Sequence, residues 1–266
     1  MSQSLLVDRH GHVGLVVMNR PPHNFLNYAQ IGEIADACEE LDSDGDIRAI
    51  VLAAEGRSFC AGADFAGGGV APDSGDDAGE REVIGGSATL QLYSEGVRLF
   101  NVGIPIVAAV QGPAIGGGLG LAVAADFRIT CPEARFCANF AALGIHQGFG
   151  LSVTLPDLLG RRVASRILLS AKRYKGDEAV EIGLADELVA LEDVRDRALE
   201  FASEMAVNAP LALRSIRATL RGDLAERVAA ITDHEAAEQA RLSATSDAAE
   251  GARAVAERRT GNFSGN

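Results

Sequence analysis

The sequence lacks several features that would point to a membrane or a nucleic acid. It has no window of 18 or more apolar residues, and its N-terminal stretch has no basic segment followed by an apolar one. We therefore expect a cytoplasmic protein that has no membrane partner. Positive charge is scarce too, because 37 acidic residues against 24 Lys and Arg give a formal net charge of −13. A nucleic-acid partner is not expected, since any polyanionic ligand would need a local basic patch.

Metal-binding and nucleophile motifs are also missing. Cys38, Cys60, Cys131 and Cys137 form neither a Cys-x-x-Cys pair nor a Cys/His spacing typical of zinc sites. They lie in apolar stretches, so we expect reduced, structural thiols and no metal. The stretch GRSFC resembles a GxSxG nucleophile elbow around Ser58, but cysteine replaces the last glycine. We expect no serine or cysteine nucleophile.

Residues 112–127, GPAIGGGLGLAVAADF, contain three adjacent glycines that fit no nucleotide-binding motif. No lysine follows Gly118 as a P-loop requires, and Leu121 takes the place of the third glycine of a dinucleotide motif. A strand that enters a helix through glycines leaves backbone N–H groups unobstructed, where the helix dipole places about half a positive charge. Two interpretations remain: the glycines allow close packing, or they bind an anion or oxyanion.

Hydrophobic spacing predicts repeated strand–helix units. Apolar runs at 12–19, 48–54 and 104–110 precede helical patterns at 27–41, 88–100 and 117–125. Asn27, with Gln30 three residues later, resembles a capping box at the start of the first helix. These units predict an α/β fold with right-handed crossovers. Strand patterns fade after about residue 148, and the C-terminal quarter is expected to be helical, including 224–258. The first predicted helix has a core-facing set of apolar residues: Ile31, Ile34, Ala35, Cys38 and Leu41.

Residues 65–86 interrupt this regularity. The segment is rich in Gly and Asp and has no hydrophobic period. A loop of this length is either a lid over a site or a tolerated surface insert. Both interpretations remain open from the sequence.

Four stretches, in order, resemble the enoyl-CoA hydratase/isomerase (crotonase) superfamily: MNRPPHNFLN, GRSFCAGADF, IVAAVQGPAIGGGLGLAVAADFRI and LGIHQGFGLSVTLPDLLG, followed by IGLADELV. The resemblance implies a spiral of ββα units over 1–200 and a helical trimerisation region over 201–266. It also implies a homotrimer or a hexamer made as a dimer of trimers. The expected substrate is an acyl-CoA thioester, with no separate cofactor. The oxyanion hole falls on the N–H groups of Ala61 and Gly117, which would stabilise developing enolate charge.

The acid/base residues of the hydratases are absent from the matching positions. The resemblance places their two glutamates at Gly120 and Phe140. Positioned general acid/base groups contribute about 100- to 10,000-fold each, so standard hydration is not expected. Isomerisation, hydrolysis, decarboxylation and C–C cleavage stay open. A catalytically inactive acyl-CoA-binding or assembly subunit is the alternative.

Other residues are candidates for the missing proton transfer. His146 lies on the loop where related enzymes carry an acidic catalytic residue, and an unperturbed pKa near 6.5 suits the task. The competing interpretation is an ordinary loop histidine. Glu82 and Tyr93 are further candidates, within or just after the segment 65–86.

Further substrate contacts follow from the same motifs. The predicted binding residues are Arg20, Pro22, His23, Arg57, Phe59, Ala63, Asp64, Phe65, Gly116, Gly120, Phe140 and Phe263. A basic group is expected to form a solvated or intersubunit helix face: Arg161, Arg162, Arg166, Lys172, Arg173 and Lys175.

Overall fold

Two β-sheets organise the chain. The computed structural model describes residues 4–63 and 87–266. Within these ranges a larger sheet has the strand order β1-β2-β3-β4-β6-β9 and a smaller one has the order β5-β7-β8. The larger sheet contains β1 (Leu5–His10), β2 (Val13–Met18), β3 (Ala49–Ala54), β4 (Ile106–Val110), β6 (Phe127–Thr130) and β9 (Glu187–Leu188). The smaller sheet contains β5 (Pro113–Ile115), β7 (Arg135–Cys137) and β8 (Tyr174–Lys175).

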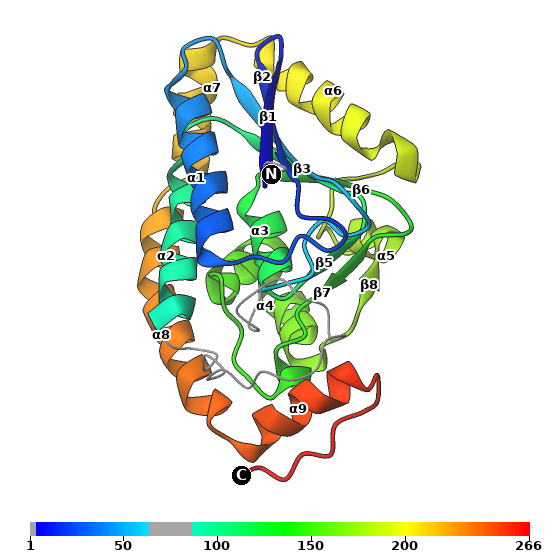
Figure 1. Cartoon of the computed structure of the whole chain (residues 1–266). Helices are drawn as coiled ribbons and strands as arrows, with labels where there is room; N and C mark the ends of the chain where they lie inside the picture. The colour runs from blue at the N-terminus through cyan, green and yellow to red at the C-terminus, as the bar shows by residue number, and fades with distance from the viewer. Residues whose placement is uncertain (1–3, 64–86) are drawn as a thin grey trace.

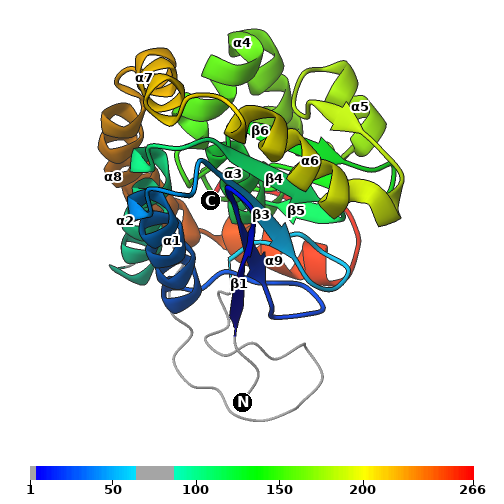
Figure 2. The ribbon, with the colours of Figure 1, turned by 90° about the horizontal axis from the view of Figure 1, so that it is seen from above.

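The strands predicted from hydrophobic runs form the centre of the larger sheet. Every residue of β2, β3 and β4 is buried. These strands pair in parallel, whereas β1 pairs antiparallel with β2 at the edge. Helices lie on both sides of the larger sheet (Figures 1 and 2), which explains the nearly continuous apolar sequence of its central strands.

The helices follow their predicted positions closely. The described elements are α1 (Tyr28–Ser43), α2 (Ser87–Asn101), α3 (Gly117–Ala124), α4 (Leu151–Ser170), α5 (Gly176–Glu181), α6 (Val194–Ala206), α7 (Pro210–Arg221), α8 (Leu224–Ser243) and α9 (Ser246–Ala256), with short 3-10 turns η1 (Ala141–Leu143) and η2 (Leu191–Asp193). All five predicted core residues of α1 are buried. The Asn27 side chain caps α1 by accepting the Gln30 amide at 2.9 Å. The Gln30 side chain instead accepts from Arg20, so only half of the capping box forms.

The C-terminal helices pack against earlier elements of the chain. The predicted helical stretch 224–258 divides into α8 and α9. Helix α8 runs alongside α2 (Figure 1). Helix α9 packs on η1. None of the helices in the described part of the chain is both long and apolar enough to cross a membrane.

Candidate active site

Asn24 ties the RPPHN turn to the loop that follows β3. Its side chain is fully buried, and its amide nitrogen donates to the Glu55 and Ser58 carbonyls at 2.7 and 2.8 Å. Its side-chain oxygen accepts the Arg20 amide at 2.9 Å. The two motif segments are therefore held together by one side chain with both ends satisfied.

The segment 60–63 is held between two other stretches of backbone. The Cys60 amide donates to Pro113 O and the Ile115 amide donates to Cys60 O, both at 3.0 Å. On the other side, the Leu26 amide donates to Gly62 O at 2.8 Å. These bonds bring the first loop directly beside β5, which leads into α3.

The prediction for Ala61 needs correction. Its amide already donates to the His23 carbonyl at 2.9 Å, so it is engaged within the chain. The amide two residues later has a different environment. In the ranges 4–63 and 87–266, no hydrogen-bond acceptor faces the Ala63 N–H. A Cβ built on Gly117 would lie 3.8 Å from Ala63 N, which places Ala63 beside the start of α3.

The three glycines at the start of α3 have three different roles. Gly116 has φ +55 and its amide donates to Cys137 O at 2.8 Å. A Cβ at Gly118 would lie 2.1 Å from Cys60 O, so close packing explains that glycine. Gly117 is not crowded, and its amide has no acceptor within the described residues. Both interpretations of this motif therefore apply, each to a different glycine.

The two positions that lack glutamates have apolar surroundings. Gly120 faces Phe149, whose Cβ would lie 2.5 Å from a Cβ at position 120. Phe140 is buried, and its Cζ lies 3.8 Å from the Cβ position of Gly116. A carboxylate at position 120 has no room beside Phe149. A glutamate at position 120 would therefore require Phe149 to move.

The side chains of His146 and Tyr93 contact other residues of the chain. His146 Nδ1 lies 2.8 Å from Gln147 O, and its ring packs edge-on against His234 of α8 with centroids 5.6 Å apart. Tyr93 is buried and its hydroxyl donates to Gln239 Oε1 at 3.0 Å. Burial raises the pKa of the Tyr93 hydroxyl, which keeps it protonated. Glu82, Asp64 and Phe65 lie outside the described residues, as does the whole segment 65–86.

The predicted substrate contacts divide into surface and core residues. Pro22 and Arg57 are exposed and adjacent, with the Arg57 amide donating to Pro22 O at 3.2 Å. His23 is half-buried, and its Nδ1 lies 3.2 Å from Ser58 Oγ. Phe59 is fully buried, so its role as a substrate contact is corrected to a core residue.

Arg20 and Phe263 have contacts within the chain. Arg20 Nη1 donates to the Phe25 carbonyl at 3.0 Å, on the same turn as Pro22 and His23. Phe263 lies on the C-terminal tail with 44% of its surface exposed and folds over Gly261. The surface candidates Arg20, Pro22, His23 and Arg57 thus lie on adjoining turns, whereas Phe263 belongs to a separate region.

The cysteines are structural, as predicted. All four are buried and unpaired. Burial raises the pKa of the Cys60 thiol to about 12, which removes thiolate character at neutral pH. Ser58 is buried as well.

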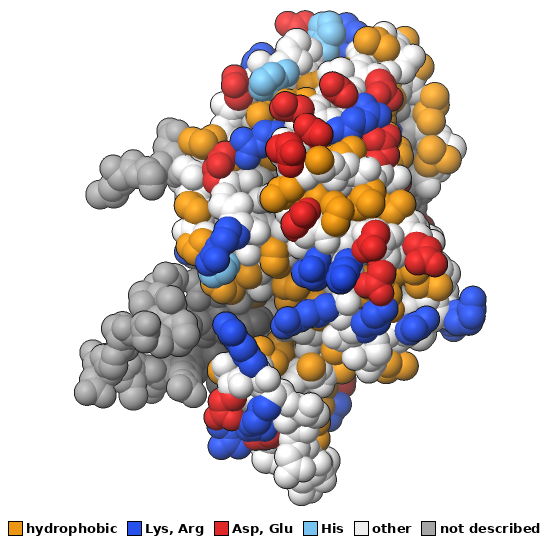
Figure 3. Space-filling model, turned by 90° about the vertical axis from the view of Figure 1, so that its right-hand side faces the viewer, with side chains coloured by type: hydrophobic (Ala, Val, Ile, Leu, Met, Phe, Trp, Pro, Cys, Tyr) orange, Lys and Arg blue, Asp and Glu red, His pale blue; other side chains and the backbone are white. Residues whose placement is uncertain are grey.

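Basic side chains gather locally despite the negative net charge. Figure 3 shows Lys and Arg in a band across the middle of the face that carries α5 and β8. The six basic residues between positions 161 and 175 are all exposed. Arg161, Arg162 and Arg166 lie on α4, whereas Lys172, Arg173 and Lys175 follow its last residue, Ser170, so the predicted helix face holds only for the first three. A polyanionic ligand would meet favourable potential on this face.

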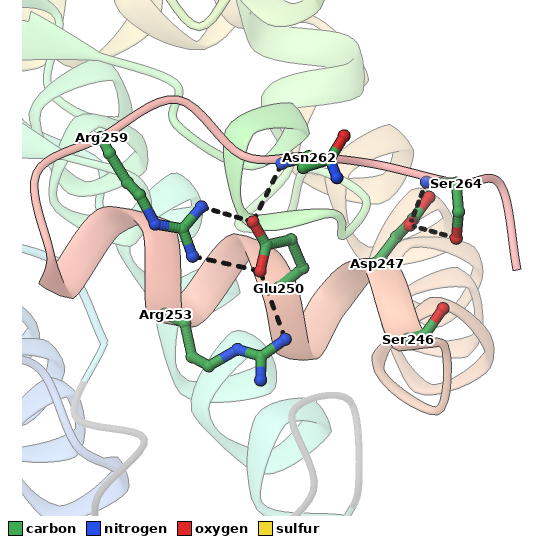
Figure 4. Close-up of a pocket in the computed structure, with 7 residues that line it drawn as sticks. All are labelled: Ser246, Asp247, Glu250, Arg253, Arg259, Asn262 and Ser264. Atoms are coloured by element: carbon green, nitrogen blue, oxygen red, sulfur yellow. Dashed lines mark hydrogen bonds and ion pairs between the residues drawn. The ribbon is translucent and has the colours of Figure 1, made fainter.

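A hollow near the C-terminus is lined by charged residues that pair with one another. Figure 4 shows the Glu250 carboxylate between Arg253 and Arg259, with the Asn262 amide donating to it at 2.9 Å. Asp247 accepts the Ser264 amide at 2.7 Å. These contacts fasten the tail to α9. The lining residues are Ser246, Asp247, Glu250, Arg253, Arg259, Asn262 and Ser264.

The sequence reasoning missed two residues that border the GFG turn at 148–150. Phe149 is a bulky residue between two glycines, a pattern that signals a tight turn. Glu235 interrupts the apolar face of α8 and is fully buried. A lone acid at a core-facing helical position was the available signal for Glu235.

Comparison with known proteins places these features in a family. The sequence profile described as enoyl-CoA hydratase/isomerase matches residues 8–266. A probable enoyl-CoA hydratase of Mycobacterium tuberculosis is 34% identical over 241 residues, covering 90% of this chain and 88% of that protein. The carnitinyl-CoA dehydratase of Proteus mirabilis is 32% identical over the full length of both chains.

Solved structures agree with the sequence comparison. The crystal structure of an enoyl-CoA hydratase/isomerase from Pseudoalteromonas atlantica has a TM-score of 0.82 at 28% identity, covering 98% of this chain and all of that one. A Mycobacterium paratuberculosis relative has a TM-score of 0.81 at 32% identity over both complete chains. The chain belongs to the enoyl-CoA hydratase/isomerase family and has its crotonase fold.

Proposed function

We propose that the chain binds an acyl-CoA thioester and polarises its carbonyl with the N–H groups of Ala63 and Gly117. The observation that carries this proposal is the placement, on adjoining segments, of two amides that have no acceptor among residues 4–63 and 87–266. The start of α3 adds the positive end of its dipole. Preorganised donors of this kind stabilise the enolate that develops next to a thioester, typically by about 3–4 kcal/mol per donor.

We propose further that the reaction differs from hydration by two carboxylates. Gly120, Phe140 and Phe149 make an apolar boundary next to α3. Such a boundary disfavours a positioned, activated water. Isomerisation, decarboxylation, thioester hydrolysis by an unassisted water and C–C cleavage all require the same enolate or oxyanion stabilisation, so the two amides serve each of them.

The nucleotide part of the ligand is assigned to the turn around Pro22 and Arg57. Both residues are exposed, and Arg57 has no carboxylate partner within the described part of the chain. A phosphate on coenzyme A would supply the anion that the Arg57 guanidinium lacks.

A second candidate function is acyl-CoA binding without turnover. The close packing of Phe149 on Gly120 favours this second function, because Phe149 leaves no room for an acidic side chain at position 120. Incubation of the protein with enoyl-, β-keto- and aryl-CoA thioesters, followed by mass spectrometry of the products, separates the two. Turnover of any thioester supports the enzyme, whereas tight binding without a product supports the binding subunit. Absence of binding to every thioester would contradict both.

We propose that the C-terminal helices assemble the chain into trimers. Helix α7 exposes Leu211 and Leu220 to 80% and 81%, so both large apolar side chains are available for a contact between subunits. Replacing both with glutamate should convert an oligomer to monomers in light scattering. A wild-type monomer would refute the proposal.

A further inference from the structure

A buried carboxylate on α8 holds the backbone at the start of α4. Glu235 has no exposed surface, and its Oε2 accepts the Gly150 amide at 2.8 Å. Its Oε1 accepts the Ser152 amide at 3.0 Å. The first amides of a helix have no partner within the helix, so this side chain, 85 residues along from Gly150, satisfies two of them. Burial of a carboxylate is unfavourable without such bonds.

The turn that Glu235 holds has a strained and closely packed backbone. Phe149 has φ +61 and Gly150 has φ +72. A bulky residue in the left-handed region costs free energy and persists only where surrounding contacts hold it. Added Cβ atoms at Gly96 and Gly120 would lie 2.8 and 2.5 Å from Phe149, so the ring fits between α2 and α3 only because both positions are glycine.

A second set of hydrogen bonds holds the same turn from the other side. Tyr93 of α2 donates to Gln239 Oε1 at 3.0 Å, and Gln239 Nε2 donates to the His146 carbonyl at 2.8 Å. Tyr93 also packs edge-on against Phe149, with ring centroids 6.1 Å apart. Helix α8 thus fixes the turn at both ends, through Glu235 and Gln239.

The turn at 148–150 lies next to α3, whose first residue, Gly117, has an amide without an acceptor among the described residues. Phe149 packs on Gly120, one turn along α3 from Gly117. We propose that Glu235 is a positioning residue for the acyl end of the thioester site: by holding the Gly150 and Ser152 amides, it keeps Phe149 against α3. This inference rests on the proposed function for its ligand, and Glu235 itself touches no ligand.

The test compares two glutamates of the same helix. Glu235→Gln keeps the shape but provides one acceptor for two amides. Glu238→Gln is the matched control, three residues along, where the native side chain forms an exposed ion pair with Arg241. Hydrogen exchange of peptides spanning 146–153 reports the hold on the turn. Dissociation constants for acetyl-CoA and free CoA, measured by calorimetry, report the effect on ligand binding. The turn should affect only binding of the acyl group, which free CoA lacks.

We expect Glu235→Gln to accelerate hydrogen exchange in this segment at least tenfold. It should raise the dissociation constant of acetyl-CoA at least fivefold and change that of free CoA less than twofold. Glu238→Gln should match the wild type in each measurement. Tyr93→Phe removes only the hydrogen bond to Gln239 and should raise the dissociation constant of acetyl-CoA about threefold. This variant tests the inference if Glu235→Gln fails to fold. An unchanged ratio of the two dissociation constants in the folded variants would overturn the inference. Wild-type protein that binds no acetyl-CoA would instead overturn the proposed function.

Discussion

Replacing Gly117 with alanine should separate ligand binding from folding. The new Cβ would lie 3.8 Å from Ala63 N, which is ordinary van der Waals contact, and no closer atom of a described residue obstructs it. Gly117 is the first residue of α3, and alanine has a helix propensity up to about 1 kcal/mol better than glycine. The variant should therefore fold with a melting temperature at or slightly above that of the wild type.

The same methyl group would stand next to the two proposed donors. We expect this methyl group to obstruct an oxygen that approaches both amides, because it would lie 3.8 Å from Ala63 N. Loss of one oxyanion donor typically costs about 3–4 kcal/mol, which corresponds to a rate decrease of about 100- to 1,000-fold. We expect at least a hundredfold loss of any thioester turnover and at least a tenfold weaker acetyl-CoA complex by calorimetry.

Gly118→Ala is the control for this prediction. Its Cβ would lie 2.1 Å from Cys60 O, so backbone has to move and the melting temperature should fall by several degrees. Gly117→Ala that binds acetyl-CoA as the wild type does would refute the role of Gly117. A melting temperature lowered as far as that of Gly118→Ala would refute the packing argument.

Three further predictions concern the apolar boundary, a thiol and the tail. The double variant Gly120→Glu/Phe140→Glu should give no crotonyl-CoA hydration, because the new side chain at position 120 clashes with Phe149. Adding Phe149→Gly removes the clashing Cβ, and glycine suits φ +61 at this position, so the triple variant should give measurable hydration. Equal hydration rates for the double and triple variants would contradict the steric argument. Burial raises the pKa of Cys60 to about 12, so Ellman's reagent at pH 8 should leave this thiol unmodified in the folded protein and modify it in denaturant. Rapid modification of the folded protein that acetyl-CoA blocks would contradict a structural role for Cys60. The Arg259 guanidinium and the Asn262 amide lower the pKa of Glu250 from 4.5 to about 2. The contacts of the C-terminal tail should therefore be complete above pH 4.5 and lost as the pH falls towards 2, which hydrogen exchange at 259–266 would report as faster exchange. Glu250→Gln should remove that pH dependence.

The longer elements were predictable because they show either a helical period of apolar residues or a continuous apolar run. The predicted core face of α1 and the all-apolar strands β2, β3 and β4 are examples. Strands β5, β7 and β8 have only two or three residues, which is too short for a period to show. Their pairing depends on partners far along the chain.

The site was predictable as a pair of motifs but not as individual donors. Whether Ala61 or Ala63 has a free amide depends on the His23 carbonyl, which reaches Ala61 only in the folded chain. The steric role of Phe149 likewise depends on glycines at positions 96 and 120. A sequence pattern identifies residue types, whereas these features arise from contacts between distant segments.

The most direct test of the proposed thioester site is a crystal structure of the protein with acetyl-CoA. Our account predicts that the thioester carbonyl oxygen lies about 2.7–3.1 Å from both Ala63 N and Gly117 N. A thioester oxygen bound away from these two amides, or bound to Ala61 N with the His23 bond broken, would contradict it.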